Sequence, residues 1–120
     1  VRLNPDGTVV IHVLISESGM GQRSSLCKMA AETLQVPLQN IHVSPADTMV
    51  NPYEFGLVGS RGTYGVGSAV IKAAEDAKQK LFEMAAPKLG ASPEKLATKD
   101  CRIYIKDTPD VSVTWKKAAW

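Results

Sequence analysis

Apolar, strand-like runs alternate with turn signals in the first third of the chain. A Pro-Asp-Gly turn at 5–7 separates a short run at 1–3 from a longer one at 8–15, which is rich in β-branched residues. Because β-branched residues favour extended backbone, the pattern predicts a hairpin whose second strand is largely buried. The glycine-containing segment 18–21 ends that strand, and a further short strand is predicted at 41–44.

Two later segments carry the spacing of amphipathic helices. Apolar residues recur every three or four positions from Gln22 to about Gln35, so a helix is predicted there. A longer helix is predicted to begin near Val66, and we expect Pro87 to kink or end it and Gly90 to supply a left-handed stop. The residues predicted to share its apolar face are Val66, Val70, Ala73, Ala77, Leu81, Met84 and Ala85.

The last quarter of the chain returns to strand-like sequence. A short helix is predicted to begin at 92–94, followed by an alternating strand at 101–105 and a further strand at 111–113. The main order is strand, strand, helix, strand, helix, strand, which two helices on one face of a mixed sheet would satisfy. The chain is therefore expected to form a single α/β (α+β) domain over 1–120, built as a two-layer sandwich.

Composition and charge exclude several classes of partner. The 120 residues include 14 Lys and Arg against 12 Asp and Glu, giving a net charge of +2, and 6% are aromatic. Neither value is typical of a nucleic-acid surface, and the 8–15 run is too short to cross a bilayer, so we expect neither nucleic acid nor membrane as a partner. Cys27 and Cys101 form neither a paired zinc motif nor a disulfide framework, which favours a reducing compartment, the cytoplasm.

The first glycine-rich junction, at 18–23, links the buried strand to the first helix. Gly19 and Gly21 allow a sharp turn that would leave the first helical N–H groups free to meet an anion or a polar heterocycle. The side-chain amide of Gln22 can both donate and accept a hydrogen bond. Taken alone, the junction favours a tight turn before a helix over a ligand site.

The second glycine-rich junction, at 56–67, opens the long helix after an irregular connection that is long for a compact domain. It offers further bare N–H groups together with Ser60, Arg61 and Thr63. If the strands before the two junctions are parallel, both loops open on the same edge of the sheet and could hold a phosphate-bearing cofactor between them. The alternatives are a non-catalytic small-ligand or nucleotide-binding module, and an interaction domain whose glycines only shape turns.

The other polar candidates favour structural roles. His12 and His42 lie in predicted strands without a neighbouring acidic or cysteine ligand, so each is expected to be an ordinary strand residue. Cys27 lies beside the core face of the first helix and is interpreted as a small apolar residue. Trp115 and Trp120 match no partner pattern.

Several motifs, in order and spacing, resemble one enzyme family. They are Met20-Gly21-Gln22, Asp47-Thr48, Pro52-Tyr53, Gly56, Gly59-Ser60-Arg61 and the helical run from Gly67 to Ala74. The chain resembles the large, molybdenum-binding subunit of the xanthine dehydrogenase and aldehyde oxidoreductase family. The resemblance spans essentially all of the chain, which looks like one segment of the molybdopterin-binding region of a longer subunit. Because the sequence starts at Val1, either a trimmed domain or a piece of a longer polypeptide is expected.

The resemblance implies a molybdopterin-binding segment of a hydroxylase that inserts a water-derived oxygen into an aldehyde or an N-heterocycle. The cofactor would be molybdopterin, either alone or as a dinucleotide. By the resemblance, Gly21 and Gln22 contact the pterin, and Gly59 lies closest to the substrate. The residues implied to hold the cofactor are Gly21, Gln22, Gly59, Ser60, Arg61, Gly62 and Thr63.

The resemblance also implies what this chain does not supply. The family's catalytic glutamate belongs to a part of the subunit outside this chain, so no catalytic residue and no metal ligand is nominated, and the isolated chain is expected to be inactive. Iron–sulfur clusters and FAD are expected on other segments or subunits. The implied partners are the rest of the molybdenum subunit, an iron–sulfur subunit, an optional flavin subunit and a small-molecule substrate.

One residue departs from the family pattern. Arg23 stands where the family commonly has glycine after Met-Gly-Gln. Its side chain is expected either to pair with a cofactor phosphate or to mark a relative with altered binding.

Overall fold

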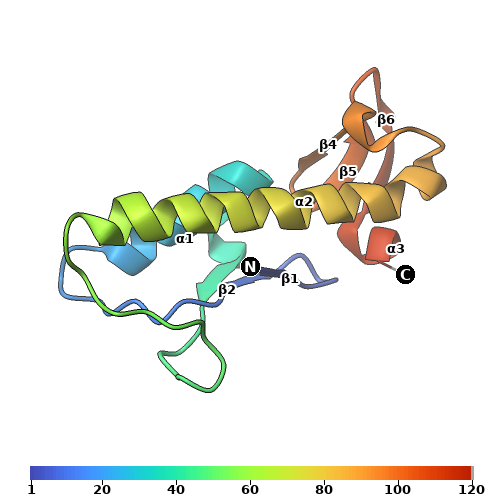
Figure 1. Cartoon of the computed structure of the whole chain (residues 1–120). Helices are drawn as coiled ribbons and strands as arrows, with labels where there is room; N and C mark the ends of the chain where they lie inside the picture. The colour runs from blue at the N-terminus through green and yellow to red at the C-terminus, as the bar shows by residue number, and fades with distance from the viewer. Residues whose placement is uncertain (120) are drawn as a thin grey trace.

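A long helix joins two small sheets in the computed structural model, which describes residues 1–119 (Figure 1). Trp120 lies outside the described residues. The N-terminal sheet contains β1 (Arg2–Leu3), β2 (Val9–Ile11) and β3 (Ile41–Val43). β1 pairs antiparallel with β2, and β2 pairs parallel with β3. The predicted hairpin is therefore confirmed, although its second strand is limited to Val9–Ile11 of the expected 8–15 run, and the condition that the strands before the two junctions are parallel is met.

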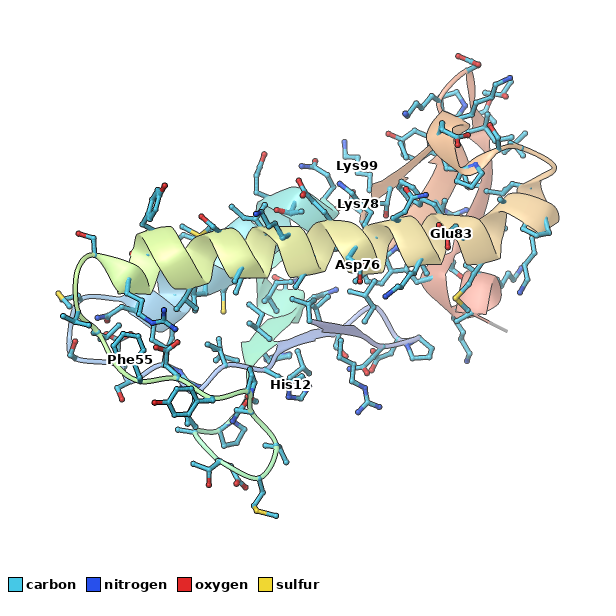
Figure 2. All side chains as sticks on the ribbon, viewed as in Figure 1. His12, Phe55, Asp76, Lys78, Glu83 and Lys99 are labelled. Atoms are coloured by element: carbon cyan, nitrogen blue, oxygen red, sulfur yellow. The ribbon has the colours of Figure 1, made fainter. Side chains whose placement is uncertain are left out.

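Two helices pack against each other beside this sheet. The first is α1 (Gln22–Leu34), which follows β2, and the second is α2 (Gly67–Leu89), which begins directly after the π-helical turn η2 (Arg61–Val66). The 23 residues of α2 give a length of about 35 Å, in a molecule whose longest dimension is 46 Å. Lys78 on α2 ties the two helices together, because its Nζ donates to the Thr33 carbonyl at 2.8 Å (Figure 2).

The end of α2 confirms one prediction and corrects another. Gly90 caps the helix with a left-handed φ of 63°, as predicted. The helix nevertheless continues through Pro87, which was expected to kink or end it. Proline removes only the bond to the carbonyl of Glu83, and this residue is exposed, so water can satisfy that carbonyl.

The buried face of α2 differs from the predicted stripe in its second half. Val66, Val70, Leu81 and Ala85 are buried as expected, whereas Met84 is 48% exposed. The structure buries Ala74 and Phe82 in addition. The reason is that α2 contacts α1 at one end and the second sheet at the other, so no single straight stripe serves both neighbours.

The C-terminal sheet is separate from the N-terminal one, which corrects the expected single mixed sheet. It contains the antiparallel strands β4 (Leu96–Lys99), β5 (Arg102–Ile105) and β6 (Thr108–Thr114). Short 3₁₀ turns precede β3 and β4, namely η1 (Leu38–Asn40) and η3 (Pro93–Lys95). The α/β class is confirmed, with two three-stranded sheets instead of one.

A short final helix, α3 (Trp115–Ala119), completes the second half of the core. The Trp115 side chain is 2% exposed, and its Nε1 donates to Thr98 Oγ1 at 3.1 Å. Trp115, for which the sequence indicated no partner, therefore anchors α3 to the C-terminal sheet.

Candidate functional site

The two glycine-rich junctions meet at one cavity. The parallel pairing of β2 and β3 brings them to the same edge of the sheet. Both strands end at the same edge of the N-terminal sheet, and the chain runs from there to α1 and to η2. A cavity of about 620 Å³ lies between the start of α1 and the start of α2. Gln22 and all five residues from Gly59 to Thr63 line it, whereas Gly21 does not.

Gly62 brings the two junctions into contact. A Cβ atom at this position would lie 3.0 Å from Leu57 Cδ2 and 3.6 Å from Gln22 Cγ. The first of these distances is tighter than ordinary van der Waals contact, so a side chain here would displace its neighbours. Glycine therefore sets the width of the cavity between η2 and α1.

Gln22, the first residue of α1, has an incomplete set of hydrogen bonds. Its side chain is buried, with 4% exposure, and its Nε2 donates to Ser18 Oγ at 3.0 Å. The buried Oε1 has no partner among the described residues. Turning the amide over would only exchange the orphaned acceptor for an orphaned donor. Because an unsatisfied buried polar atom costs about 1–3 kcal/mol, this position fits a ligand that completes the bonding.

At the start of α1, the N–H group of Arg23 and those of the two preceding glycines are occupied, which corrects in part the expectation that the first helical N–H groups would be free for an anion. Glu17 Oε1 accepts from the N–H groups of Gly19 and Gly21 at 3.0 and 2.9 Å, and its Oε2 accepts from that of Arg23 at 3.1 Å. The bond from Arg23, followed by those from the glycines, holds the pKa of Glu17 below its ordinary value. Gly21 thus serves the site through its left-handed turn, with φ of 70°, and not through a free N–H.

The second junction keeps its N–H groups open. Gly59 and Ser60 take consecutive left-handed conformations, with φ of 57° and 60°, that turn the chain into η2. The N–H groups of Gly62 and Thr63 have no hydrogen-bond partner in the described part of the chain. Both residues line the same cavity as Gln22.

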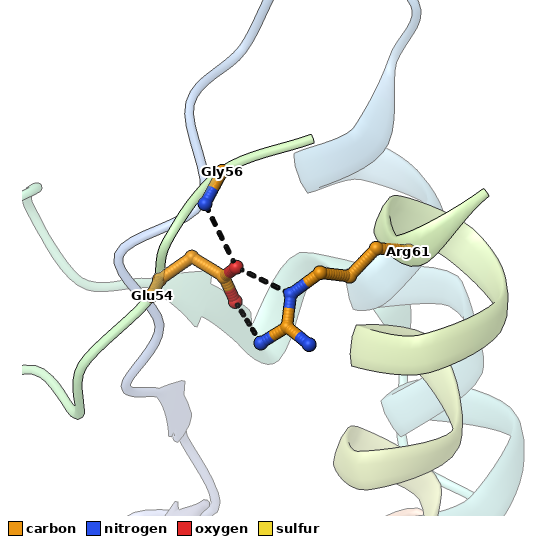
Figure 3. Close-up of polar contacts among 3 residues, drawn as sticks. All are labelled: Glu54, Gly56 and Arg61. Carbon is orange, nitrogen blue, oxygen red and sulfur yellow. Dashed lines mark hydrogen bonds and ion pairs between the residues drawn. The ribbon is translucent and has the colours of Figure 1, made fainter. Parts of the chain in front are cut away.

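The guanidinium of Arg61 is bound within its own loop (Figure 3). Its Nε donates to Glu54 Oε1 at 2.7 Å and its Nη2 to Oε2 at 3.4 Å, while the Gly56 N–H donates to Oε1 at 3.2 Å. Arg61 Cζ also lies 4.6 Å from the ring centroid of Phe55, which Figure 2 places on the same loop. The Arg61 bond holds the pKa of Glu54 below its ordinary value and raises that of Arg61.

Sequence reasoning missed Glu17 and Glu54, the two carboxylates that shape the loops. Glu17 stands five positions before the helix and matches no capping box, so no local pattern marks it. Glu54 had a weak signal, because it is the only glutamate in the connection from 45 to 62 and Arg61 is the only cation there.

Arg23 does not line the cavity. Its Nη2 donates to the carbonyls of Ser44 at 2.7 Å and Val43 at 3.3 Å, and its Nη1 to that of Ile15 at 3.4 Å. The guanidinium is therefore engaged with the backbone that leaves β2 and β3, and it is not directed at a cofactor phosphate.

The remaining polar candidates lie in strands, turns or the core, away from the cavity lining. His42 is exposed in β3, His12 follows β2 with a buried Nδ1, and Cys27 packs against the core. Asp47 shapes a turn, since its carboxylate accepts from the Met49 N–H at 2.8 Å. Over residues 1–119, no three His, Cys, Asp or Glu side chains gather in a way that could hold a metal ion. Within the same range, no helix is long and apolar enough to cross a membrane.

Large apolar side chains surround the cavity and face solvent. Met20, Val58 and Tyr64 line the cavity and are 72%, 60% and 80% exposed. Scattered apolar residues are ordinary on a surface, but a group of this size beside a cavity is typical of a surface that another segment or protein covers.

Comparisons with known proteins identify the family of the chain. The family model described as the molybdopterin cofactor-binding domain matches residues 1–120. The carbon monoxide dehydrogenase large chain of Afipia carboxidovorans is 29% identical over 120 residues, which are 100% of this chain and 15% of that protein. The xanthine dehydrogenase molybdenum-binding subunit of Escherichia coli O157:H7 is 32% identical over 109 residues, covering 90% of this chain and 14% of that one.

A solved structure shows the same fold. The crystal structure of Cu,Mo-CO dehydrogenase in its carbon monoxide reduced state matches with a TM-score of 0.84 and 29% identity, over 99% of this chain and 15% of that chain. The chain thus spans 14–15% of the length of these relatives. Since the family model covers all 120 residues and the fold agrees throughout, the chain belongs to the molybdopterin cofactor-binding domain family.

Proposed function

We propose that the cavity between α1 and η2 is the part of the molybdopterin site that this chain supplies. The observation that carries the proposal is one cavity lined both by Gln22, whose buried Oε1 has no partner among the described residues, and by Gly62 and Thr63, whose N–H groups are open. A flat heterocycle with donors and acceptors on its edges would complete both sets of bonds.

The walls of the cavity suit such a ligand. Its volume of about 620 Å³ falls within the range of about 300–1,000 Å³ typical of small-molecule sites. Met29, Leu57 and Ile71 supply apolar surface, while Gln22 and the 59–63 segment supply the polar groups. In this arrangement Gly21 turns the chain, Gln22 binds the heterocycle edge, and Gly62 and Thr63 donate from the opposite wall.

The intact protein is proposed to be a molybdenum hydroxylase acting on an aldehyde or an N-heterocycle. When bound, molybdenum supplies the redox chemistry, whereas the residues of this chain bind and orient its pterin. The names of the relatives support a large subunit, and the exposed apolar side chains around the cavity support its coverage by the rest of that subunit. Iron–sulfur and flavin subunits, a separate catalytic glutamate and the mono- or dinucleotide form of the cofactor belong to the same proposal.

We also place the protein in the cytoplasm. Both Cys27 and Cys101 are free thiols, which supports a reducing compartment. Because no side chain of this chain is assigned a proton-transfer step, the isolated chain is expected to hydroxylate nothing.

The proposal is tested in the full-length subunit, expressed with its partners and a cofactor supply. Gln22→Ala should lower both the molybdenum and the pterin bound per polypeptide, because it removes the buried amide. Gln39→Ala is the matched control, since Gln39 is exposed on η1 away from the cavity lining. Unchanged molybdenum and pterin in a folded Gln22→Ala subunit would refute the proposal and favour an interaction domain whose glycines only shape turns.

A further inference from the structure

We propose that Glu17 and Arg23 are positioning residues that hold the Gln22 amide in its ligand-binding orientation before the ligand arrives. This inference rests on the proposed function, because it concerns the same cavity. Neither residue lines the cavity, so both would act through Gln22 and not by touching the cofactor.

Glu17 fixes the backbone on both sides of Gln22. One of its carboxylate oxygens accepts from the N–H of Gly21, the residue before Gln22, and the other accepts from the N–H of Arg23, the residue after it. A third bond, from Gly19, closes the turn that precedes them. Because one carboxylate holds the peptide group that follows Gln22 and the one that precedes Gly21, the backbone at Gln22 has little freedom to rotate.

Arg23 fixes this turn relative to the sheet. Its guanidinium donates to three carbonyls, one from the end of the segment after β2 and two at the end of β3. These carbonyls lie at the strand edge from which both cavity loops depart. Arg23 thereby fixes the start of α1 to the sheet edge, and Gln22 Cγ on that helix lies 3.6 Å from where a Cβ at Gly62 would stand.

The side chain of Gln22 is held in turn by Ser18, whose Oγ accepts from Nε2 at 3.0 Å. Ser18 belongs to the turn that Glu17 closes. The amide is thus buried and oriented with one atom left over for a ligand. A group held in its bound orientation loses less conformational entropy on binding, which lowers the rate at which the ligand leaves.

Glu17 also determines which kind of group can approach. Its negative charge stands at the N-terminus of α1, the position that would otherwise attract an anion. A phosphate is repelled there, so recognition at this wall is left to the neutral amide of Gln22.

The test measures cofactor release from the full-length, loaded subunit. The variants are Glu17→Gln and Arg23→Lys, each made alone and together with Gln22→Asn. The Gln22→Asn side chain is one methylene shorter, so its amide does not reach the position of the Gln22 amide. Glu32→Gly is the control, because Glu32 is exposed near the other end of α1 and its replacement weakens the helix without reaching the cavity. The readout is the rate at which pterin appears in the buffer after dilution.

We expect Glu17→Gln and Arg23→Lys each to accelerate release by about tenfold, with Glu32→Gly close to the unmodified protein. In the Gln22→Asn background the same two changes should have no further effect, since their action passes through Gln22. Equal acceleration in both backgrounds, or an equal effect of Glu32→Gly, would overturn the inference by showing a role in fold stability alone. If Gln22→Asn itself left release unchanged, the proposed function would fail as well.

Hydrogen exchange of the cofactor-free subunit provides a second measurement that does not need the cofactor to stay bound. Glu17→Gln should speed exchange in the peptide covering 18–24 while the 28–34 part of α1 keeps its protection. Glu32→Gly should produce the opposite pattern. Unchanged exchange at 18–24 in Glu17→Gln would overturn the inference.

Discussion

Replacing Glu54 with glutamine should destabilise the loop that forms one wall of the cavity. The Glu54 side chain is 8% exposed and accepts from Arg61 Nε, Arg61 Nη2 and the Gly56 N–H. A glutamine keeps one acceptor but turns an NH₂ group towards the guanidinium. Hydrogen bonds to charged groups contribute about 1.5–3 kcal/mol, and solvent screening lowers this because the Arg61 side chain is 37% exposed. We therefore expect a loss of about 1 kcal/mol.

The pH dependence of that loss identifies its cause. The Arg61 bond lowers the pKa of Glu54 from its ordinary 4.5, so the carboxylate is ionised in the folded protein at a lower pH than in the unfolded chain. A depressed pKa contributes stability that is fully present above 4.5 and is lost as the pH falls through the folded value. The difference between Glu54→Gln and the unmodified protein should therefore be constant from pH 7 to 5 and shrink below 4.5.

Urea titrations of both proteins at pH values from 7 to 3.5 measure this difference in unfolding free energy. Glu75→Gln is the matched control, because Glu75 is exposed on α2 and has no ion-pair partner within residues 1–119. A difference that stays constant down to pH 3.5, or an equally large loss in Glu75→Gln, would refute the argument that the ionised pair stabilises the loop.

Three further substitutions test other parts of the structure. Gly62→Ala places a methyl group 3.0 Å from Leu57 Cδ2, so the amount of pterin bound per subunit should fall. The free energy of unfolding should change by only about 1 kcal/mol. An unaltered pterin content would contradict the cavity geometry. Trp115→Ala should lower the free energy of unfolding by about 3–5 kcal/mol in urea titration, because it removes an indole ring that is 2% exposed and leaves a cavity in the core. A loss below about 1 kcal/mol would contradict the burial of Trp115. Gly90→Ala should cost about 1 kcal/mol in the same assay, because its φ of 63° strains a side chain, and a neutral result would show that α2 ends elsewhere.

The elements that the sequence predicted well are those whose conformation depends on residues close by in the sequence. The hairpin of β1 and β2 follows from a Pro-Asp-Gly turn, and α1 follows from helical spacing. The meeting of the two glycine-rich loops was also predictable, because a parallel strand pair places both loops on one edge.

Other features depend on contacts that no local pattern records. β4 was missed because the β4–β5 turn uses Asp100 and Cys101 at φ of 49° and 60°, so the glycine that usually marks such a hairpin is absent. The occupation of the α1 N-terminus by Glu17 was missed because a side chain from the preceding loop reached it. The second sheet was not separated from the first, since the sequence shows which segments are strands but not which of them pair.

Helix α2 connects the cavity rigidly to the distant C-terminal sheet. Its first turn continues from η2 at the cavity wall, and its last turns pack beside β5, β6 and α3 (Figure 1). A straight rod of about 35 Å transmits a tilt from either end to the other. A displacement of the C-terminal sheet would therefore also change the angle at which α2 presents its first turn to the cavity.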